Sequence, residues 1–295
     1  MTADHPRLLH VGNVLVDVVM YLPTLPEPGG DVLADESAIT VGGGLNVLVA
    51  AVRAGLPAAY GGLHGTGPFG DLCRAALAEH GVAVLQPPLA DQDTGFTVAM
   101  VDPSGERTFA TGPGAEARLD AARLATLSVR PTDVVHVSGY GLAYPVNGPA
   151  LAGWLSTLDS KVTVIVDPGP LVADIPAPVL DAVLARADWW SCNEREARFP
   201  GAGRVGTVVR TGAGGCVLHM GNAQVSVPPF AVDAVDTNGA GDTHVGVFAA
   251  GLAAGLDPTT AALRANAAAA LAVTKRGPST APTAAEVDDL LVSHD

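Results

Sequence analysis

A repeated alternation between short apolar strands and longer helical segments is the feature that most constrains how this chain can fold. The apolar runs expected to form strands are Leu8–Val11, Val134–Val137, Val162–Val166, Trp189–Ser191, Thr207–Arg210 and Val217–His219. Ala-, Leu- and Arg-rich segments such as Leu119–Leu127 and Pro149–Leu158 have the composition of helices. Strands that alternate with helices form a mostly parallel sheet covered by helices on both faces. We therefore predict an α/β fold, with the pair Trp189-Trp190 in its core.

Two segments do not follow this alternation. Asp31–Val41 shows a looser apolar-polar pattern, and Phe96–Ala110 has the pattern of a hairpin whose turn is Pro103-Ser104-Gly105. A period of two is typical of strands with one face in water. We predict that these strands form a small β-sheet lid, drawn from about residues 16–41 and 96–112. We expect residues 1–295 to form a single α/β domain that carries this lid.

Composition excludes several classes of protein. The net charge is −14 and the only lysines are Lys161 and Lys275, whereas nucleic-acid binding needs clustered cations. Neither a run of eighteen apolar residues nor a basic-then-apolar leader is present, so we expect a cytoplasmic protein without membrane contact. Cys73, Cys192 and Cys216 lack metal-site spacing, which favours reduced thiols over a disulfide or zinc site. A phosphate site in such a chain must depend on backbone amides, a metal ion and a few arginines.

The strongest local signal is the segment Asp236-Thr237-Asn238-Gly239-Ala240-Gly241-Asp242, which precedes an expected helix over Thr243–Ala254. Gly239, Ala240 and Gly241 have almost no side chain, so their amides can approach an anion at the positive end of the helix. Such a hole suits the charge that develops on a transferring phosphoryl group. Asp242 beside it has the chemistry of a general base for an attacking hydroxyl. The alternative is a Gly-rich turn in which Asp242 serves only as a helix cap.

Four motifs together resemble the ribokinase-like (PfkB) family of sugar and nucleoside kinases, from Leu8 to about Pro282. The first is Asp236–Asp242, which is similar to D-T-x-G-A-G-D, and the second is Gly42-Gly43-Gly44-Leu45-Asn46, which is followed by Gly55 and Gly65. The third is Asn193-Glu194-Arg195-Glu196, which is similar to N-x-x-E, and the fourth is the loop Arg210–Gly215. The resemblance implies a ribokinase-like fold and an enzyme that transfers the γ-phosphoryl of ATP to a hydroxyl of a small sugar-like molecule. It also implies Asp242 as the catalytic base.

The resemblance implies further roles, position by position. The implied substrate contacts are Asp17, Gly42, Gly43 and Asn46. The implied nucleotide contacts are Asn193, Arg210, Gly212, Gly215 and Asn266, the last in the segment Ala265–Lys275 that would close over the adenine. Glu196, with Asn193, would organise Mg²⁺ largely through water. Asp236 and Asn238 would form a K⁺ site beside the carbonyls of Lys275–Pro278.

Tyr140 is a further candidate that comes from its position in the predicted sheet. It follows the strand Val134–Val137 at the carboxyl edge, where open α/β folds bind ligands. We therefore consider it a substrate contact, with simple packing as the alternative.

Departures from the family pattern leave the acceptor open. Leu48 replaces a small residue, His244 a common aromatic and Glu116 a frequent asparagine. The sequence leaves the acceptor open among ribose, fructose, a ketodeoxy acid and a nucleoside. A phosphorylated acceptor is not expected, because Arg107 is the only cation in the segments 12–17, 42–46 and 96–112. The alternatives are a nucleoside kinase of the same fold and a non-catalytic sugar- or nucleotide-binding regulatory protein.

Two stretches match G-x-G-x-x-G, Gly65–Gly70 and Gly201–Gly206, but neither has the context of a dinucleotide site. The second precedes a strand, and no acidic residue ends the strand after the first. We therefore expect the second to be a loop, and the first to open a helix over Asp71–His80 without binding a dinucleotide. The lid presents strand edges that a second subunit would cover, which predicts a homodimer through the lids. The alternative is a lid kept in solvent by its acidic side chains.

Overall fold

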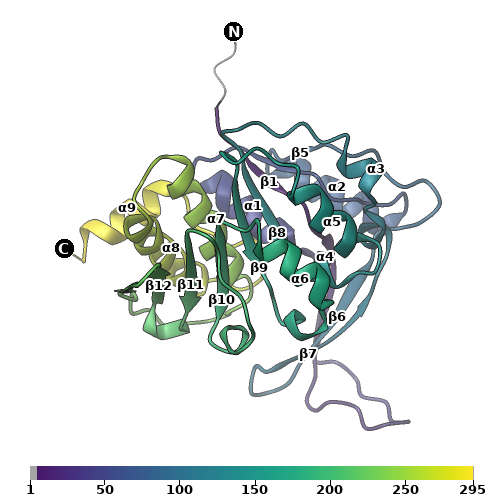
Figure 1. The fold of residues 1–295 in the computed structure, drawn as a ribbon. Helices are drawn as coiled ribbons and strands as arrows, with labels where there is room; N and C mark the ends of the chain where they lie inside the picture. The colour runs from purple at the N-terminus through teal and green to yellow at the C-terminus, as the bar shows by residue number, and fades with distance from the viewer. Residues whose placement is uncertain (1–4, 295) are drawn as a thin grey trace.

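The computed structural model describes residues 5–294, whose largest element is a nine-stranded sheet. Its order is β13-β12-β11-β10-β9-β8-β1-β4-β5 (Figure 1). The strands are β1 (Leu8–His10), β4 (Ala58–Tyr60), β5 (Ala83–Val84), β8 (Val134–Ser138), β9 (Thr163–Asp167), β10 (Trp189–Asn193), β11 (Gly206–Arg210), β12 (Cys216–Met220) and β13 (Ala223–Val227). Neighbours from β5 to β11 pair in parallel, whereas β11, β12 and β13 pair antiparallel.

Helices cover both faces of this sheet and bury two separate apolar cores. The helices are α1 (Gly44–Arg53), α2 (Pro68–Glu79), α3 (Ala121–Leu124), α4 (Gly139–Ala143), α5 (Asn147–Leu155), α6 (Ala177–Leu184), α7 (Ala240–Ala253), α8 (Pro258–Ala272) and α9 (Ala284–Val292). One core includes apolar side chains of α1, α7 and α8, and the other those of α4, α5 and α6. Trp189 lies in the first core and Trp190 in the second, because neighbours on a strand face opposite ways. The prediction that both tryptophans are core residues is confirmed.

A second sheet of four strands forms the lid. Its order is β3-β2-β6-β7, with β2 (Val14–Tyr21) parallel to β6 (Phe96–Val101) and the outer strands β3 (Glu36–Gly43) and β7 (Arg107–Gly112) antiparallel to their neighbours. Figure 1 shows β6 and β7 beside the main body, in the lower part of the view. The predicted α/β fold, with a mostly parallel sheet and a small separate β-sheet, is confirmed.

One buried carboxylate holds both ends of the hairpin formed by β6 and β7. The Glu116 side chain, which is 1% exposed, accepts the amide of Gly95 and the amide of Gly114, each at 2.8 Å. Gly95 precedes β6 and Gly114 follows β7. The two ends of the hairpin are therefore hydrogen-bonded to a single side chain.

Two expected elements differ from the structure, and one strand was not expected. The strand expected at Asp31–Val41 begins only at Glu36, because Asp31–Asp35 is largely exposed and finds no strand partner in the described chain. The helix expected at 119–127 is reduced to α3, since Ala115–Arg118 forms a separate 3₁₀ turn and the Asp120 side chain caps the helix after it. The strand β13 was not predicted; it follows a turn at Gly221.

The helices and the cysteines bear on two further expectations from the sequence. Within residues 5–294, no helix combines the length and the apolar character that crossing a bilayer requires. Cys73, Cys192 and Cys216 are free and buried, as expected of packed thiols.

Candidate active site

A cavity of about 290 Å³ lies between the lid and the carboxyl edge of the large sheet. The sequence candidates that line it are Asp17, Gly43, Asn46, Tyr140, Glu196, Arg210, Asn238, Gly239, Ala240, Gly241 and Asp242. Thr97, Phe109 and Thr111 reach it from the lid. Segments more than two hundred residues apart in sequence, such as those of Asp17 and Asp242, thus meet around one space.

The first turn of α7 presents free backbone amides to this cavity. Gly239 precedes the helix with φ of 72°, a left-handed conformation that favours glycine. The amide of Ala240 donates to the carbonyl of Thr237 at 3.4 Å, while those of Gly241 and Asp242 have no hydrogen-bond partner within residues 5–294. Unpaired amides at the positive end of a helix form a site for an anion.

Asp242 is held at this helix terminus by Asn46 from α1. The Asn46 Nδ2 donates to Asp242 Oδ2 at 3.0 Å, and its Oδ1 accepts the amide of Ser279 at 2.9 Å. Burial raises the pKa of Asp242 to about 6, and the bond from Asn46 opposes that shift. The carboxylate is therefore ionised at neutral pH and becomes protonated in mildly acidic solution.

Asp17 projects from β2 toward the same space and depends on the bare backbone of Gly42. A Cβ atom added to Gly42 would lie 2.0 Å from Asp17 Oδ2, so only glycine leaves room for this carboxylate. Burial, followed by the charge of Asp242, raises the pKa of Asp17 to about 6, whereas Arg107 lowers it. Gly42 therefore acts through Asp17, since it does not itself line the cavity.

Arg210, at the end of β11, is fixed between carboxylates. Its Nη1 lies 2.9 Å from Asp167 Oδ2 and 2.8 Å from Ser191 Oγ, and its Nη2 lies 3.7 Å from Glu196. A Cβ atom on Gly241 would lie 3.5 Å from the guanidinium carbon, so the cation is packed against the start of α7. This arrangement places a positive charge beside the free amides.

The N-x-x-E element closes on itself at the end of β10. Glu196 accepts the amide of Asn193 and its Nδ2, each at 2.8 Å, and Asn193 Oδ1 accepts the amide of Glu196 at 3.0 Å. Burial, then the charge of Asp167, raises the pKa of Glu196. Among the described residues, no cluster of three or more His, Cys, Asp or Glu side chains forms a metal cage. Glu196 and Asp167, which both line the cavity, suit Mg²⁺, because this ion keeps most of its water and binds phosphate oxygens.

Asp236, one of the two residues expected to hold K⁺, is engaged within the protein. Asp236 forms an ion pair with Arg107 of the lid, and its oxygens accept the amide of Asn238 at 2.9 Å and of Gly277 at 3.0 Å. The loop 275–278 thus contributes an amide and not a carbonyl to this carboxylate. A guanidinium is already the cation at Asp236.

Four expected nucleotide contacts lie outside the cavity, and one of them is Asn193, which holds Glu196 as described above. Gly212 and Gly215 belong to the turn between β11 and β12, with φ of 59° and 84°. Asn266 on α8 is buried, and its amide contacts His244 Nε2 at 3.1 Å and the carbonyls of Val227 and Pro228 at 3.2 and 2.9 Å. Its polar atoms are therefore engaged within the protein.

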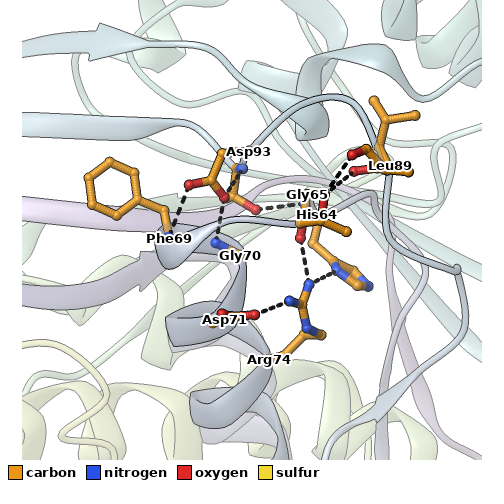
Figure 2. A network of polar contacts seen from close by, with 11 residues as sticks. His64, Gly65, Phe69, Gly70, Asp71, Arg74, Leu89 and Asp93 are labelled. Carbon is orange, nitrogen blue, oxygen red and sulfur yellow. Dashed lines mark hydrogen bonds and ion pairs between the residues drawn. The ribbon is translucent and has the colours of Figure 1, made fainter.

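The G-x-G-x-x-G stretch at Gly65–Gly70 opens α2, but its helix terminus is occupied (Figure 2). Asp93 Oδ2 accepts the amide of Phe69 at 3.1 Å and Asp93 Oδ1 that of Gly70 at 2.8 Å. Arg74 joins the same network through His64 Nδ1 at 2.9 Å. A protein carboxylate already occupies the position that a pyrophosphate would need, so this helix start does not suit a dinucleotide.

Asp167, His10 and His136 line the cavity but were not among the site residues predicted from the sequence. Asp167 directly follows the expected strand Val162–Val166, so the rule that identified Tyr140 applies to it equally. The two histidines are 126 positions apart and their pairing is a product of the fold. Burial, then the charge of Asp242, raises the pKa of Tyr140 to about 12, so its hydroxyl remains protonated.

Comparison with known proteins agrees with this architecture. The family described as pfkB family carbohydrate kinase matches residues 6–285. An uncharacterized sugar kinase, YegV of Escherichia coli, is 35% identical and the match covers 96% of this chain and 92% of that protein. An ATP-dependent ribose-1-phosphate kinase of Halopiger xanaduensis is 30% identical, with coverage of 94% and 95%.

Among solved structures, ribokinase from Giardia lamblia superposes with a TM-score of 0.84 at 22% identity, over 99% of this chain and 100% of that one. This likeness shows the fold. The match of the family over nearly the whole length carries the assignment further, because it includes the turn at α7 and the strands that surround the cavity. The chain therefore belongs to the pfkB family of carbohydrate kinases and is a phosphotransferase.

Proposed function

We propose that this enzyme transfers the γ-phosphoryl group of MgATP to a hydroxyl of a small sugar or sugar-like acceptor. The observation that carries the proposal is the position of Asp242. It stands at the N-terminus of α7 beside two free amides, it accepts a hydrogen bond from Asn46 at 3.0 Å, and it shares the cavity with Asp17. A base, an anion site and a carboxylate that can hold hydroxyl groups are the parts that such a transfer requires.

In the proposed mechanism Asp242 accepts the proton of the attacking hydroxyl as its oxygen bonds to the γ-phosphorus. The bond from that phosphorus to the oxygen that bridges to the β-phosphate breaks, and ADP leaves. The amides of Gly241 and Asp242 stabilise the negative charge on the transferred group, with Arg210 beside them. Asp17, Gly43 and Asn46 orient the acceptor, and the hydroxyl of Tyr140 donates a hydrogen bond to it. The lid excludes water, which would otherwise compete as the phosphoryl acceptor.

Glu196 and Asp167 are the carboxylates that would hold the hydrated magnesium, and Asn193 keeps Glu196 in place. The metal would neutralise phosphate charge and orient the nucleotide. Potassium is not part of the proposal, because Asp236 is already paired with Arg107. Asn238 lines the cavity, and we propose it as a contact to the acceptor or the phosphates in place of a metal ligand.

A nucleoside kinase is the second candidate, and the aromatic side chains of the cavity favour it. Phe109 of the lid is 58% exposed although it lines the cavity, and Tyr140 lines the same space. Aromatic faces of this kind can stack on a base. A turnover screen that includes ribose, fructose and adenosine separates the two candidates.

We extend the proposal to a homodimer through the lids. β3 is an edge strand of the lid sheet, and its Ile39 is 62% exposed. Uncovered strand edges are commonly protected by a second subunit. Light scattering over a dilution series tests this: a monomer at every concentration would remove the dimer and leave the proposed reaction untouched.

The catalytic proposal is tested by Asp242→Asn. Turnover should fall about 10²–10⁴-fold, the usual contribution of a general base, while ATP binding stays within a few-fold of wild type. Because burial raises the pKa of Asp242, the ionised carboxylate costs stability at neutral pH, and the variant should melt no lower than wild type at pH 7.5. A variant with turnover within a few-fold of wild type would exclude Asp242 as the base.

A further inference from the structure

Two buried histidines form the part of the cavity wall whose polar atoms have no role in the mechanism above. His10 ends β1, and His136 lies opposite it on β8 in the parallel register. The two Nδ1 atoms are 2.8 Å apart, the ring centroids 5.0 Å and the ring planes within 22° of each other. The rings therefore meet end to end, with each Nε2 at an outer end of the pair.

Both rings are neutral, so the positions of their hydrogens decide what the pair can bind. Burial, then the charge of His136, lowers the pKa of His10 well below its usual value, and burial lowers the pKa of His136 to about 3. A hydrogen bond between two Nδ1 atoms needs one N–H and one bare nitrogen. One ring therefore carries its hydrogen on Nδ1 and the other on Nε2.

The surroundings of His10 decide between the two arrangements. A Cβ atom on Gly44 would lie 1.9 Å from His10 Nε2, so this end of the pair is packed against the start of α1. The carbonyl of Asn13 accepts the amide of Gly44 at 2.7 Å, which places it near this end of the pair. The Asn13 backbone raises the pKa of His10, but His10 Nε2 makes no complete hydrogen bond to it. A carbonyl at this end favours a hydrogen on His10 Nε2. His136 then donates through Nδ1 and keeps a bare Nε2.

Both Nε2 atoms lack a hydrogen-bond partner within residues 5–294, and in this arrangement that of His136 is the bare one. His136 lines the cavity and is 1% exposed, and within residues 5–294 its Nε2 makes no hydrogen bond. A buried polar atom without a partner is costly, so its persistence at a cavity wall indicates a ligand group that completes it. A bare ring nitrogen accepts hydrogen bonds and cannot donate them. The complementary ligand group is therefore a donor.

We propose that His136 is a specificity-determining residue whose Nε2 accepts a hydrogen bond from a hydroxyl of the acceptor, and that His10 is the positioning residue that fixes its tautomer. The inference rests on the proposed transfer to a sugar-like acceptor and narrows its class. A carboxylate or phosphate at this point would face His136 acceptor to acceptor, in a cavity already lined by Asp17, Asp167, Glu196 and Asp242. We therefore expect an uncharged polyol or nucleoside to be a better acceptor than a ketodeoxy acid or a sugar phosphate.

The tautomer is measured first, by ¹⁵N NMR of protein labelled at histidine, with His136→Gln and His10→Gln to assign the signals. We expect His136 to carry hydrogen on Nδ1 and His10 on Nε2. The reverse arrangement would overturn the proposal whether or not an acceptor has been found.

The second measurement compares steady-state kinetics of His136→Leu, His136→Gln and His64→Gln with MgATP and ribose, fructose, adenosine or 2-keto-3-deoxygluconate. Loss of one hydrogen bond should raise the KM of a neutral acceptor about tenfold in His136→Leu, with kcat and the KM of ATP nearly unchanged. The amide of His136→Gln should restore part of this loss. His64 is a matched control, because it is buried, hydrogen-bonded and away from the cavity.

The outcomes separate this inference from the proposed function. A wild-type enzyme that phosphorylates none of these acceptors contradicts the proposed function, and the tautomer then decides the inference alone. If wild type is active but His136→Leu keeps its acceptor KM within twofold, or the acid is the best acceptor, the inference fails and the kinase proposal stands. A ¹⁵N signal of His136 that moves on addition of a neutral acceptor, together with the KM effect, supports it.

Discussion

Replacement of Gly42 by alanine should disable the acceptor site without touching the catalytic base. The added Cβ atom would lie 2.0 Å from Asp17 Oδ2, whereas non-bonded atoms keep about 3.5 Å apart, so the carboxylate must move by about 1.5 Å. A misplacement of about 1 Å at a reacting site commonly costs about 10²-fold. We therefore expect kcat/KM for the acceptor to fall about 10²-fold in Gly42→Ala, while the KM of ATP changes little.

The assay is release of ADP at varied acceptor concentration, with circular dichroism to show that each variant is folded. Gly153→Ala is the matched control, because no atom lies within 4 Å of the added methyl group on α5. A double-mutant cycle with Asp17→Ala isolates the cause: if Gly42→Ala acts through Asp17, the second substitution should add almost nothing. Full additivity, or an acceptor kcat/KM within threefold of wild type, would refute the reasoning.

Three further predictions follow from the carboxylates. The pKa values of Asp17 and Asp242 are raised to about 6, so kcat/KM should be constant above pH 7 and fall as pH drops through 6; a profile still flat at pH 5 would contradict this. Glu196→Gln should shift the magnesium requirement upward more than the acceptor KM, which a magnesium titration of initial rates checks, and an unchanged titration would argue against a metal role. Glu116→Ala removes the carboxylate that accepts the amides at both ends of the β6–β7 hairpin. Hydrogen exchange at these ends should accelerate, and ATP hydrolysis without acceptor should rise. Unchanged exchange would show that Glu116 does not hold the two ends.

Local patterns predicted the large sheet and the turn at α7, because strand alternation and a glycine-rich helix start depend on neighbouring residues. Boundaries were less predictable where tertiary contact decides them. The strand β3 begins at Glu36 opposite Tyr21, and nothing local in Asp31–Asp35 reveals that its partner has ended. Asp167 was within reach of the sequence, since it ends an expected strand.

Pairs that join distant segments were beyond local reasoning. Arg107 was predicted as the one cation near the acceptor, but its partner Asp236 is 129 positions away and was assigned to potassium. Asn266 was expected at the adenine, and the structure engages its amide with His244 and two carbonyls. In each case the competing partner comes from another element, and only the fold brings the two together.

The ion pair between Arg107 and Asp236 has a consequence for how the two substrates bind. Arg107 belongs to β7 of the lid, while Asp236 belongs to the turn that leads into α7, where the phosphates are proposed to bind. A change in lid position therefore alters the free energy of that turn, and the reverse holds to the same extent. Binding equilibria obey this symmetry, so whatever factor the acceptor contributes to nucleotide affinity, the nucleotide must contribute to acceptor affinity. Measured by calorimetry in either order of addition, the two factors should be equal, and removal of the Arg107 guanidinium should bring both of them toward one.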